Sequence, residues 1–135
     1  MESTISFNEE KYRFYIFENE SYLKLLNFQE NNIIQWNIFL ESSAKKSVEK
    51  DIESRNTETE LLFEINIKKI KTEIEEIIDL LDLQHKRIEN NLILNIENDD
   101  EAYMIQDILR ERLKHIETSL IDFKYKLMNY FSANY

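Results

Sequence analysis

Apolar residues recur at alternating steps of four and three along the second half of the chain. This spacing is typical of α-helices that pack along a narrow stripe, as in the seven-residue repeat of coiled coils. It predicts one helix within residues 58–96 and a second within residues 100–131. The first stripe comprises Phe63, Ile67, Ile70, Ile74, Ile77, Leu81, Ile88 and Leu92, interrupted by Gln84, and the second comprises Ile105, Leu109, Leu113, Ile116, Leu120, Phe123, Leu127 and Tyr130.

The two stripes mirror each other, as expected when a chain folds back on itself. Pairing Leu92 with Ile105 brings the remaining positions of the two stripes opposite one another. The further pairs are Ile88 with Leu109, Gln84 with Leu113, Leu81 with Ile116, Ile77 with Leu120, Ile74 with Phe123, Ile70 with Leu127 and Ile67 with Tyr130. We therefore predict an antiparallel helical hairpin centred between Asn98 and Asp99.

The predicted turn contains no Gly or Pro, because the whole chain has no Gly, no Pro and no Cys. Its sequence is "ENDD", residues 97–100, and both Asn and Asp tolerate left-handed backbone angles. We expect Asn98 to end the first helix in place of Gly. We expect Asp99 or Asp100 to cap the second helix, whose first turn also carries Glu101.

The first 41 residues are dense in aromatic residues and Ile. Three runs, "KYRFYIF", "SYLKLLNF" and "NIIQWNIFL", are separated by "ENE" and "QEN", which favours a three-stranded antiparallel β-meander over residues 1–41. The alternative is one long helix, since nothing in residues 5–57 breaks a helix. In the third run a strand would place Ile34, Trp36, Ile38 and Leu40 on one face, whereas a helix would carry a stripe of Tyr12, Ile16, Leu23, Leu26, Ile33 and Leu40, interrupted by Asn19, Glu30 and Asn37.

Residues 42–57 are polar and form the expected connector. Ser42 or Ser43 could cap a short helix there, and Thr57 with Glu60 fits a capping box at the start of the first long helix. The sequence thus predicts one α+β domain over residues 1–135: a β-meander, a short helix and a long helical hairpin. The alternative fold is an all-α helical bundle or coiled coil.

Apolar residues also lie outside the two stripes of the hairpin. They are Ile65, Ile78, Leu80, Leu83, Ile108, Ile121, Tyr125, Met128 and Phe131. Such a wide apolar surface requires another layer. The N-terminal third, a second copy or a partner could supply it, and this surplus suggests a homodimer through the hairpins.

The chain carries 27 acidic and 17 basic residues, a net charge of −10. That balance argues against direct binding of nucleic acid, which needs clustered Lys and Arg, and against anionic membranes. A basic protein surface is the natural electrostatic partner. The start "MESTISFNEEKYRF" lacks the features of a signal peptide, and no apolar run approaches the ~18 residues of a membrane span. We therefore expect a cytoplasmic protein, and the abundance of Ile, Asn and Lys suggests a low-GC bacterium or phage.

Candidate catalytic chemistry is sparse. Without Gly the chain cannot form a phosphate-binding loop or a nucleophile elbow. Its two histidines lie at helical spacing from acids, in Asp82-x-x-His85 and Glu111-x-x-x-His115, but they flank the stripes and few carboxylates are near. A metal-dependent enzyme is the weakest interpretation, so we predict no catalytic, cofactor-binding or metal-binding residues. Gln84, within its stripe, is expected to fix helix register or oligomeric state.

These observations favour a small, acidic, non-catalytic protein-binding module. Its sharper form is an inhibitor or regulator of a basic or nucleic-acid-binding target, as in immunity proteins, antitoxins and phage anti-defence proteins. Acidic side chains of the first long helix and an aromatic residue of the N-terminal third are the candidate contacts: Glu73, Glu75, Glu76, Asp79, Asp82 and Trp36. The alternative is a self-assembling structural scaffold.

Overall fold

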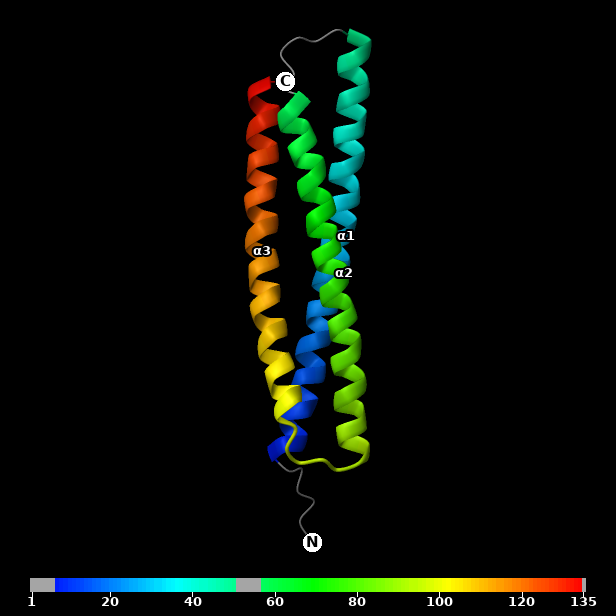
Figure 1. The fold of residues 1–135 in the computed structure, drawn as a ribbon, viewed down its shortest axis with the longest axis vertical. Helices are drawn as coiled ribbons and strands as arrows, with labels where there is room; N and C mark the ends of the chain where they lie inside the picture. Colours follow the sequence, from blue (N-terminus) through cyan, green and yellow to red (C-terminus); the bar gives the residue numbers. More distant parts are fainter. Residues whose placement is uncertain (1–6, 51–56, 135) are drawn as a thin grey trace.

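The described residues form a bundle of three long helices (Figure 1). The computed structural model describes the backbone of residues 7–50 and 57–134, and the side chains of residues 9–43 and 58–133. Helix α1 spans Phe7–Lys50, α2 spans Thr57–Ile93 and α3 spans Asp100–Asn134. The helices run up, down and up, so α1 and α3 are parallel and α2 is antiparallel to both.

The predicted β-meander is wrong, because residues 7–41 belong to the single helix α1 and the described residues contain no strand. The residues expected to share one face of a strand do not do so. Leu40 is 1% exposed, whereas Ile34 and Ile38 lie on the solvent side. The "ENE" and "QEN" segments continue the helix, as the all-α alternative required.

The seven-residue repeat of buried residues in α1 is hard to recognise in the sequence, and the cause is physical. Its most buried stripe repeats every seven residues, but one member is polar, while Phe14, Phe17 and Phe28 are apolar and exposed. Polarity therefore does not report burial along this helix. The repeating residues are Tyr12, Asn19, Leu26, Ile33 and Leu40, flanked by buried Tyr15 and Ser43. The alternative stripe was thus correct at Tyr12, Leu26, Ile33 and Leu40 but not at Leu23, which is exposed.

The prediction of a separate short helix within residues 42–57 is also wrong. α1 continues through Ser42 and Ser43 to Lys50, so neither serine caps a new helix. Residues 51–56 and the Thr57 side chain lie outside the described residues. α2 begins at Thr57, as the capping-box pattern predicted.

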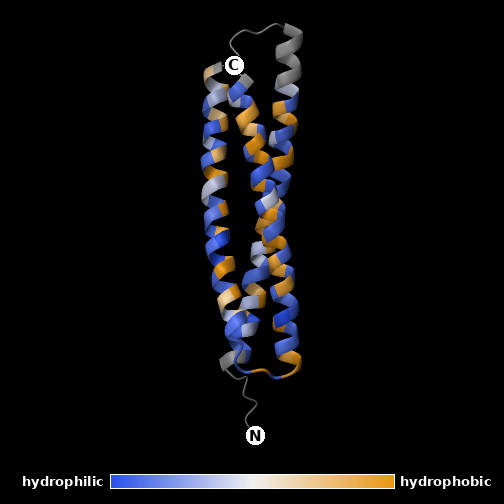
Figure 2. Cartoon of the chain, in the orientation of Figure 1, coloured by the Kyte–Doolittle hydropathy of each residue, from blue (hydrophilic) through white to orange (hydrophobic). Residues whose placement is uncertain are grey.

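The two predicted stripes of the hairpin form most of the core. Hydrophobic residues recur along all three helices (Figure 2). Leu26, Ile33 and Leu40 of α1 complete the same cluster. α1 is therefore the additional layer that the hairpin required, and it covers part of the off-stripe apolar surface. Ile78, Leu80 and Phe131 are partly buried, while Ile65, Leu83, Ile108, Ile121, Tyr125 and Met128 remain exposed.

The antiparallel hairpin is confirmed, but its predicted register is wrong by one heptad. Gln84 bonds to Gln106 at 3.2 Å, although it was expected opposite Leu113, seven residues later. At the far end the Tyr130 hydroxyl donates to Glu60 Oε2 at 3.0 Å, one heptad before the predicted partner Ile67. Both stripes repeat every seven residues, so a slip of seven keeps apolar residues opposite apolar residues.

The turn uses Asn95, in place of the predicted Asn98, to end α2, and Asp99 to cap α3. Asn95 has a φ of 54° and follows the last turn of α2. The amide of Ile96 donates to the carbonyl of Asn91 at 2.9 Å, which is the hydrogen bond of a Schellman helix ending. Asp99 caps α3, since its Oδ1 accepts from the amide of Ala102 at 3.2 Å. The prediction of an Asp cap at 99 or 100 is confirmed, and the prediction for Asn98 is wrong.

Candidate interaction surface

One layer of the core is polar and joins all three helices. Asn19 and Gln106 exchange two hydrogen bonds, of 3.0 and 2.7 Å, and the Gln84 amide donates to Gln106 Oε1 at 3.2 Å and to the Ala102 carbonyl at 2.8 Å. Gln106 also donates to Glu18, which accepts from Arg110 at 2.9 Å. Every polar atom of the Gln106 side chain is therefore satisfied, as buried amides require. We call Asn19, Gln84 and Gln106 the polar layer.

Asp99 fixes the end of the hairpin. Its carboxylate accepts from Arg87 Nε at 2.6 Å, from Arg87 Nη2 at 2.9 Å and from Asn91 Nδ2 at 2.7 Å. The hydrogen bonds from Arg87, with those from Asn91 and the Ala102 amide, outweigh the effect of burial and lower the pKa of Asp99 to about 2. This carboxylate is therefore ionised at neutral pH and fully used in holding α2 to α3.

A tyrosine cluster packs α1 against α3 at the same end of the bundle. The Tyr12 and Tyr103 rings stack at 6.1 Å, Tyr15 meets Tyr103 edge-on at 6.3 Å, and the Lys11 ammonium lies 4.0 Å from the Tyr103 ring centroid. Burial and the neighbouring Tyr103 raise the pKa of Tyr12 well above its ordinary value. Tyr12 therefore stays neutral at physiological pH, and the cluster contributes packing.

The two histidines lie apart from each other on the hairpin. His85 Nε2 lies 2.9 Å from Glu89 Oε1, within α2. His115 Nε2 lies 4.0 Å from Glu73 Oε1, across the α2–α3 contact. In residues 9–43 and 58–133, no three His, Cys, Asp or Glu side chains gather as they would around a metal ion. Asp82, which the sequence places near His85, pairs with Lys86 at 2.9 Å.

The five predicted acidic contacts on α2 have different surroundings. Glu76 pairs with Arg112 of α3 at 3.0 Å, and Glu73 approaches His115, so these two carboxylates are engaged within the bundle. Glu75, Asp79 and Asp82 are exposed. They follow one another at helical spacing on the outer side of α2, as does Glu89 one heptad after Asp82.

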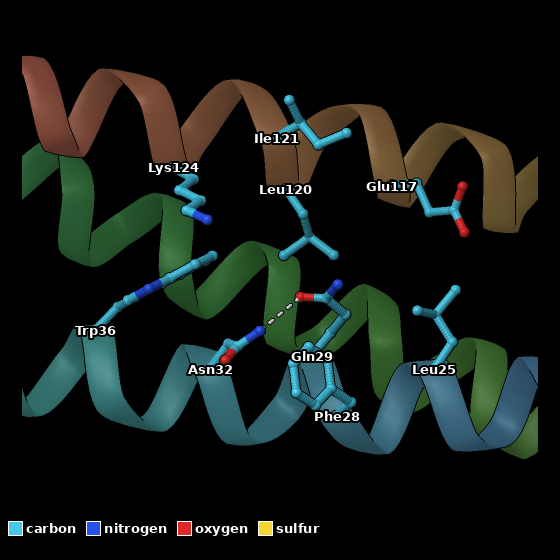
Figure 3. Close-up of a pocket in the computed structure, with 9 residues that line it drawn as sticks. All are labelled: Leu25, Phe28, Gln29, Asn32, Trp36, Glu117, Leu120, Ile121 and Lys124. Atoms are coloured by element: carbon cyan, nitrogen blue, oxygen red, sulfur yellow. Dashed lines mark hydrogen bonds between the residues drawn. The ribbon is translucent and has the colours of Figure 1, made fainter.

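Trp36, the sixth predicted contact, lies away from these acids, on α1 beside α3. Its ring packs on Phe123 at 5.5 Å. It lines a groove of about 430 Å³ between α1 and α3, which Figure 3 shows from the side. The other lining residues are Leu25, Phe28, Gln29, Asn32, Glu117, Leu120, Ile121 and Lys124. The structure thus separates the candidate contacts into two surfaces, and only Trp36 belongs to the groove.

The lining of this α1–α3 groove is mostly apolar, with the amides of Gln29 and Asn32 on α1 and the charged Glu117 and Lys124 on α3. Figure 3 shows Leu120 and Trp36 pointing into the space between the two helices, with Glu117 and Lys124 at opposite ends of the α3 side. The Asn32 amide donates to Gln29 Oε1 at 3.2 Å. Such a groove can hold apolar side chains and bond to a polar backbone or amide.

The outer surface of α1 beside this groove is almost free of charge. Charged residues make up 33% of the chain, yet Glu30 is the only one between Leu25 and Leu40. Phe28, Ile34, Ile38 and Phe39 are exposed within that segment. The surface of the helix there consists of apolar and amide side chains.

This surface was not predicted from the sequence, because a β-meander would place Ile34 and Ile38 on the same face as Leu40, which is buried. The local lack of charge was the available signal. Together with a seven-residue helical period, this lack of charge distinguishes the buried residues of α1 from apolar residues that are exposed and lie outside the core.

Comparison with family models, with characterised proteins and with solved structures found no match to this chain. None of the three described helices contains an apolar stretch sufficient to cross a membrane.

Proposed function

We propose that this protein is a non-catalytic protein-binding module whose contact surface is the uncharged face of α1, from Leu25 to Leu40. The carrying observation is the coincidence of exposed Phe28, Ile34 and Ile38 with the lack of charge in a chain of net charge −10. Cores of protein interfaces are depleted in charged residues and enriched in aromatic ones.

The chemistry of this face favours a protein partner of matching apolar and amide character. Nucleic acid would require clustered Lys and Arg, and Glu30 is the only charged residue of the segment. A contiguous apolar surface on a soluble bundle is a common mark of an interaction site. The adjoining groove adds depth, so that protruding side chains of the partner can be buried beside Trp36.

A second candidate function is inhibition or regulation of a basic target through the outer side of α2. Glu75 and Asp79 are exposed carboxylates on that side, and the net charge of −10 favours association with a cationic surface. Binding of this kind weakens steeply with salt. Binding through α1 changes little between low and physiological ionic strength, so a salt series on the bound partner separates the two candidates.

Photo-crosslinking in the cells that naturally make the protein tests the proposal. A photoreactive phenylalanine replaces Ile34, which is exposed at the centre of the uncharged face, and in a matched variant it replaces Asp79 on α2. We expect a discrete covalent adduct with a protein, a second copy included, from position 34 and none from position 79.

Two outcomes would contradict the proposal. One is the absence of any adduct from position 34 under conditions in which the variant remains folded by circular dichroism. The other is an adduct from position 79 alone, which would support the acidic side of α2 instead. The self-assembling scaffold is the remaining alternative, and growth of particles without a defined mass in light scattering would favour it.

A further inference from the structure

The exposed stripe of α1 has the same pattern in both chain directions. Phe28, Asn31, Gln35 and Ile38 follow at steps of three, four and three, so apolar residues lie at both ends and amides lie between them. All four are exposed, Phe28 at 61% and Ile38 at 52%. The centre of this pattern is residue 33. We call these four residues the uncharged stripe.

Two charges on α3 are arranged symmetrically about the same level of the bundle. Asn19 bonds to Gln106, and Trp36 packs on Phe123, and both pairs are separated by 87 residues. The same offset places Ile33 level with Leu120, which lies three residues after Glu117 and four residues before Lys124. Among the described residues neither Glu117 nor Lys124 forms an ion pair.

We infer that the partner of this face is a second copy of the chain, bound antiparallel about a two-fold axis near the level of Ile33. The inference rests on the proposed function. An antiparallel α1–α1 contact pairs Phe28 with Ile38 of the second copy and Asn31 with Gln35 of the second copy. A two-fold contact must be self-complementary, and this stripe is.

The same axis makes the α3 charges complementary. The two-fold axis lies in the plane of the α1–α1 contact, so both α3 helices lie on the same side of the α1 pair. Glu117 of each copy therefore faces Lys124 of the other copy. Two chains of charge −10 repel each other, and this contact limits the repulsion because the uncharged stripe carries no acid and each Glu117 faces a lysine. A basic partner would gain nothing from an uncharged stripe.

The mass of the protein in solution gives the first test. Sedimentation equilibrium is expected to yield twice the 16.5 kDa chain mass. Ile38→Lys should raise the dissociation constant at least tenfold, since it buries a charge opposite Phe28. Ile65→Lys is the matched control, because Ile65 is 53% exposed on α2 and should leave the mass unchanged. A monomeric wild-type chain at 100 µM, or dissociation by Ile65→Lys alone, overturns the inference.

Charge exchange gives the second test. Glu117→Lys alone and Lys124→Glu alone should each weaken the dimer several-fold, because like charges then face each other. The double variant Glu117→Lys/Lys124→Glu should restore wild-type affinity. Neither residue forms an ion pair with another described residue, so circular dichroism should be the same for all three variants. Failure of the double variant to recover overturns the proposed axis.

Disulfide trapping reports the direction of the helices. The natural chain has no Cys, so each introduced thiol is the only one per chain. When Phe28→Cys and Ile38→Cys chains are mixed and oxidised, the mixed disulfide should dominate over linkage of either variant to itself. In an antiparallel pair two copies of position 28 are about 15 Å apart. Self-linkage of the Phe28→Cys chain would indicate parallel helices and overturn the inference. A monomer that still crosslinks to another protein from position 34 would exclude the dimer and retain the proposed function.

Discussion

Asp99 shows how one side chain can organise a reversal that has no Gly or Pro. It caps α3 through the Ala102 amide and holds α2 through Arg87 and Asn91. A charged acceptor with several donors is stabilised strongly, and its loss leaves those donors without a partner. The sequence predicted the cap from residue type, but the contacts across the turn required the folded hairpin.

The pH dependence of stability follows from the lowered pKa of Asp99. Its pKa is about 2 in the folded protein and 3.8 as the ordinary value. The contribution of Asp99 is therefore fully present above pH ~4 and is lost as the pH falls through about 2. Asp99→Asn should lower the free energy of unfolding by ~2 kcal/mol at pH 7. It should also make the free energy of unfolding fall less steeply as the pH is lowered from 4 to 2. Urea unfolding of both proteins between pH 4 and 2 measures this difference. If the free energies of unfolding of the two proteins fell in parallel, Asp99 would not be the source of the pH dependence.

At the scale of the element, the ending of α2 depends on Asn95. Asn tolerates a left-handed conformation better than other residues with a Cβ, and Gly tolerates it best. In the absence of Gly, the sequence offered several Asn residues near the turn. Only the folded backbone, with φ of 54° at Asn95, decided which of them ends the helix.

Substitutions at Asn95 test this role. Asn95→Ala should lower the free energy of unfolding by ~1 kcal/mol, because a Cβ without a polar group is disfavoured at positive φ. Asn95→Gly should be neutral or slightly stabilising. Asn90→Ala, on the exposed side of α2, is the matched control and should not destabilise, since Ala favours helix. Equal destabilisation by Asn90→Ala and Asn95→Ala in denaturant titrations would show that the effect is not conformational.

α1 shows why an element can be assigned incorrectly from its own sequence. Alternation of polar and apolar residues from Ile34 to Leu40 resembles a strand, and the helical stripe is interrupted by Asn19. Asn19 is nevertheless buried, since Gln106 satisfies its amide. Asn19 can therefore belong to the buried stripe only because Gln106, 87 positions away, bonds to its amide.

For the whole molecule, the polar layer selects one register among several apolar ones. The stripes alone would also satisfy a hairpin displaced by seven residues. That register would place Gln84 against Leu113 and leave its amide without the Gln106 partner. Buried polar residues commonly specify register at a cost in stability. The single unique alignment of the bundle is thus attributed to Asn19, Gln84 and Gln106.

Replacing the whole layer and replacing one member should have opposite effects. Gln106→Leu leaves the buried Asn19 amide without its partner and removes one of the two acceptors of the Gln84 amide, so it should lower the free energy of unfolding by ~2–3 kcal/mol. Asn19→Leu/Gln84→Leu/Gln106→Leu should be as stable as the natural chain or more so, but should populate more than one register. Denaturant unfolding measures the stability, and duplicated amide signals in NMR spectra report the registers. A triple variant with one set of signals would contradict the role in register.

The candidate surface was only partly predictable from the sequence. Trp36 was predicted as a contact and lines the groove, but its groove partners on α3, such as Ile121, lie far along the chain. The acids of α2 were grouped by proximity in sequence, and the bundle places them on a different side. The function class inferred from charge and missing motifs stays a proposal.

The features that repeat locally could be predicted from the residues alone: two apolar stripes of period seven, their antiparallel return, an Asp cap for α3 and a chain without Gly-dependent sites. These follow from helix geometry and from single side chains. The tertiary structure decided the remainder: α1 as helix, the register of α3, the residue that ends α2 and the apolar residues left exposed. A repeating stripe is unchanged by a shift of one heptad, so only contacts between distant residues, above all the polar layer, could remove that ambiguity.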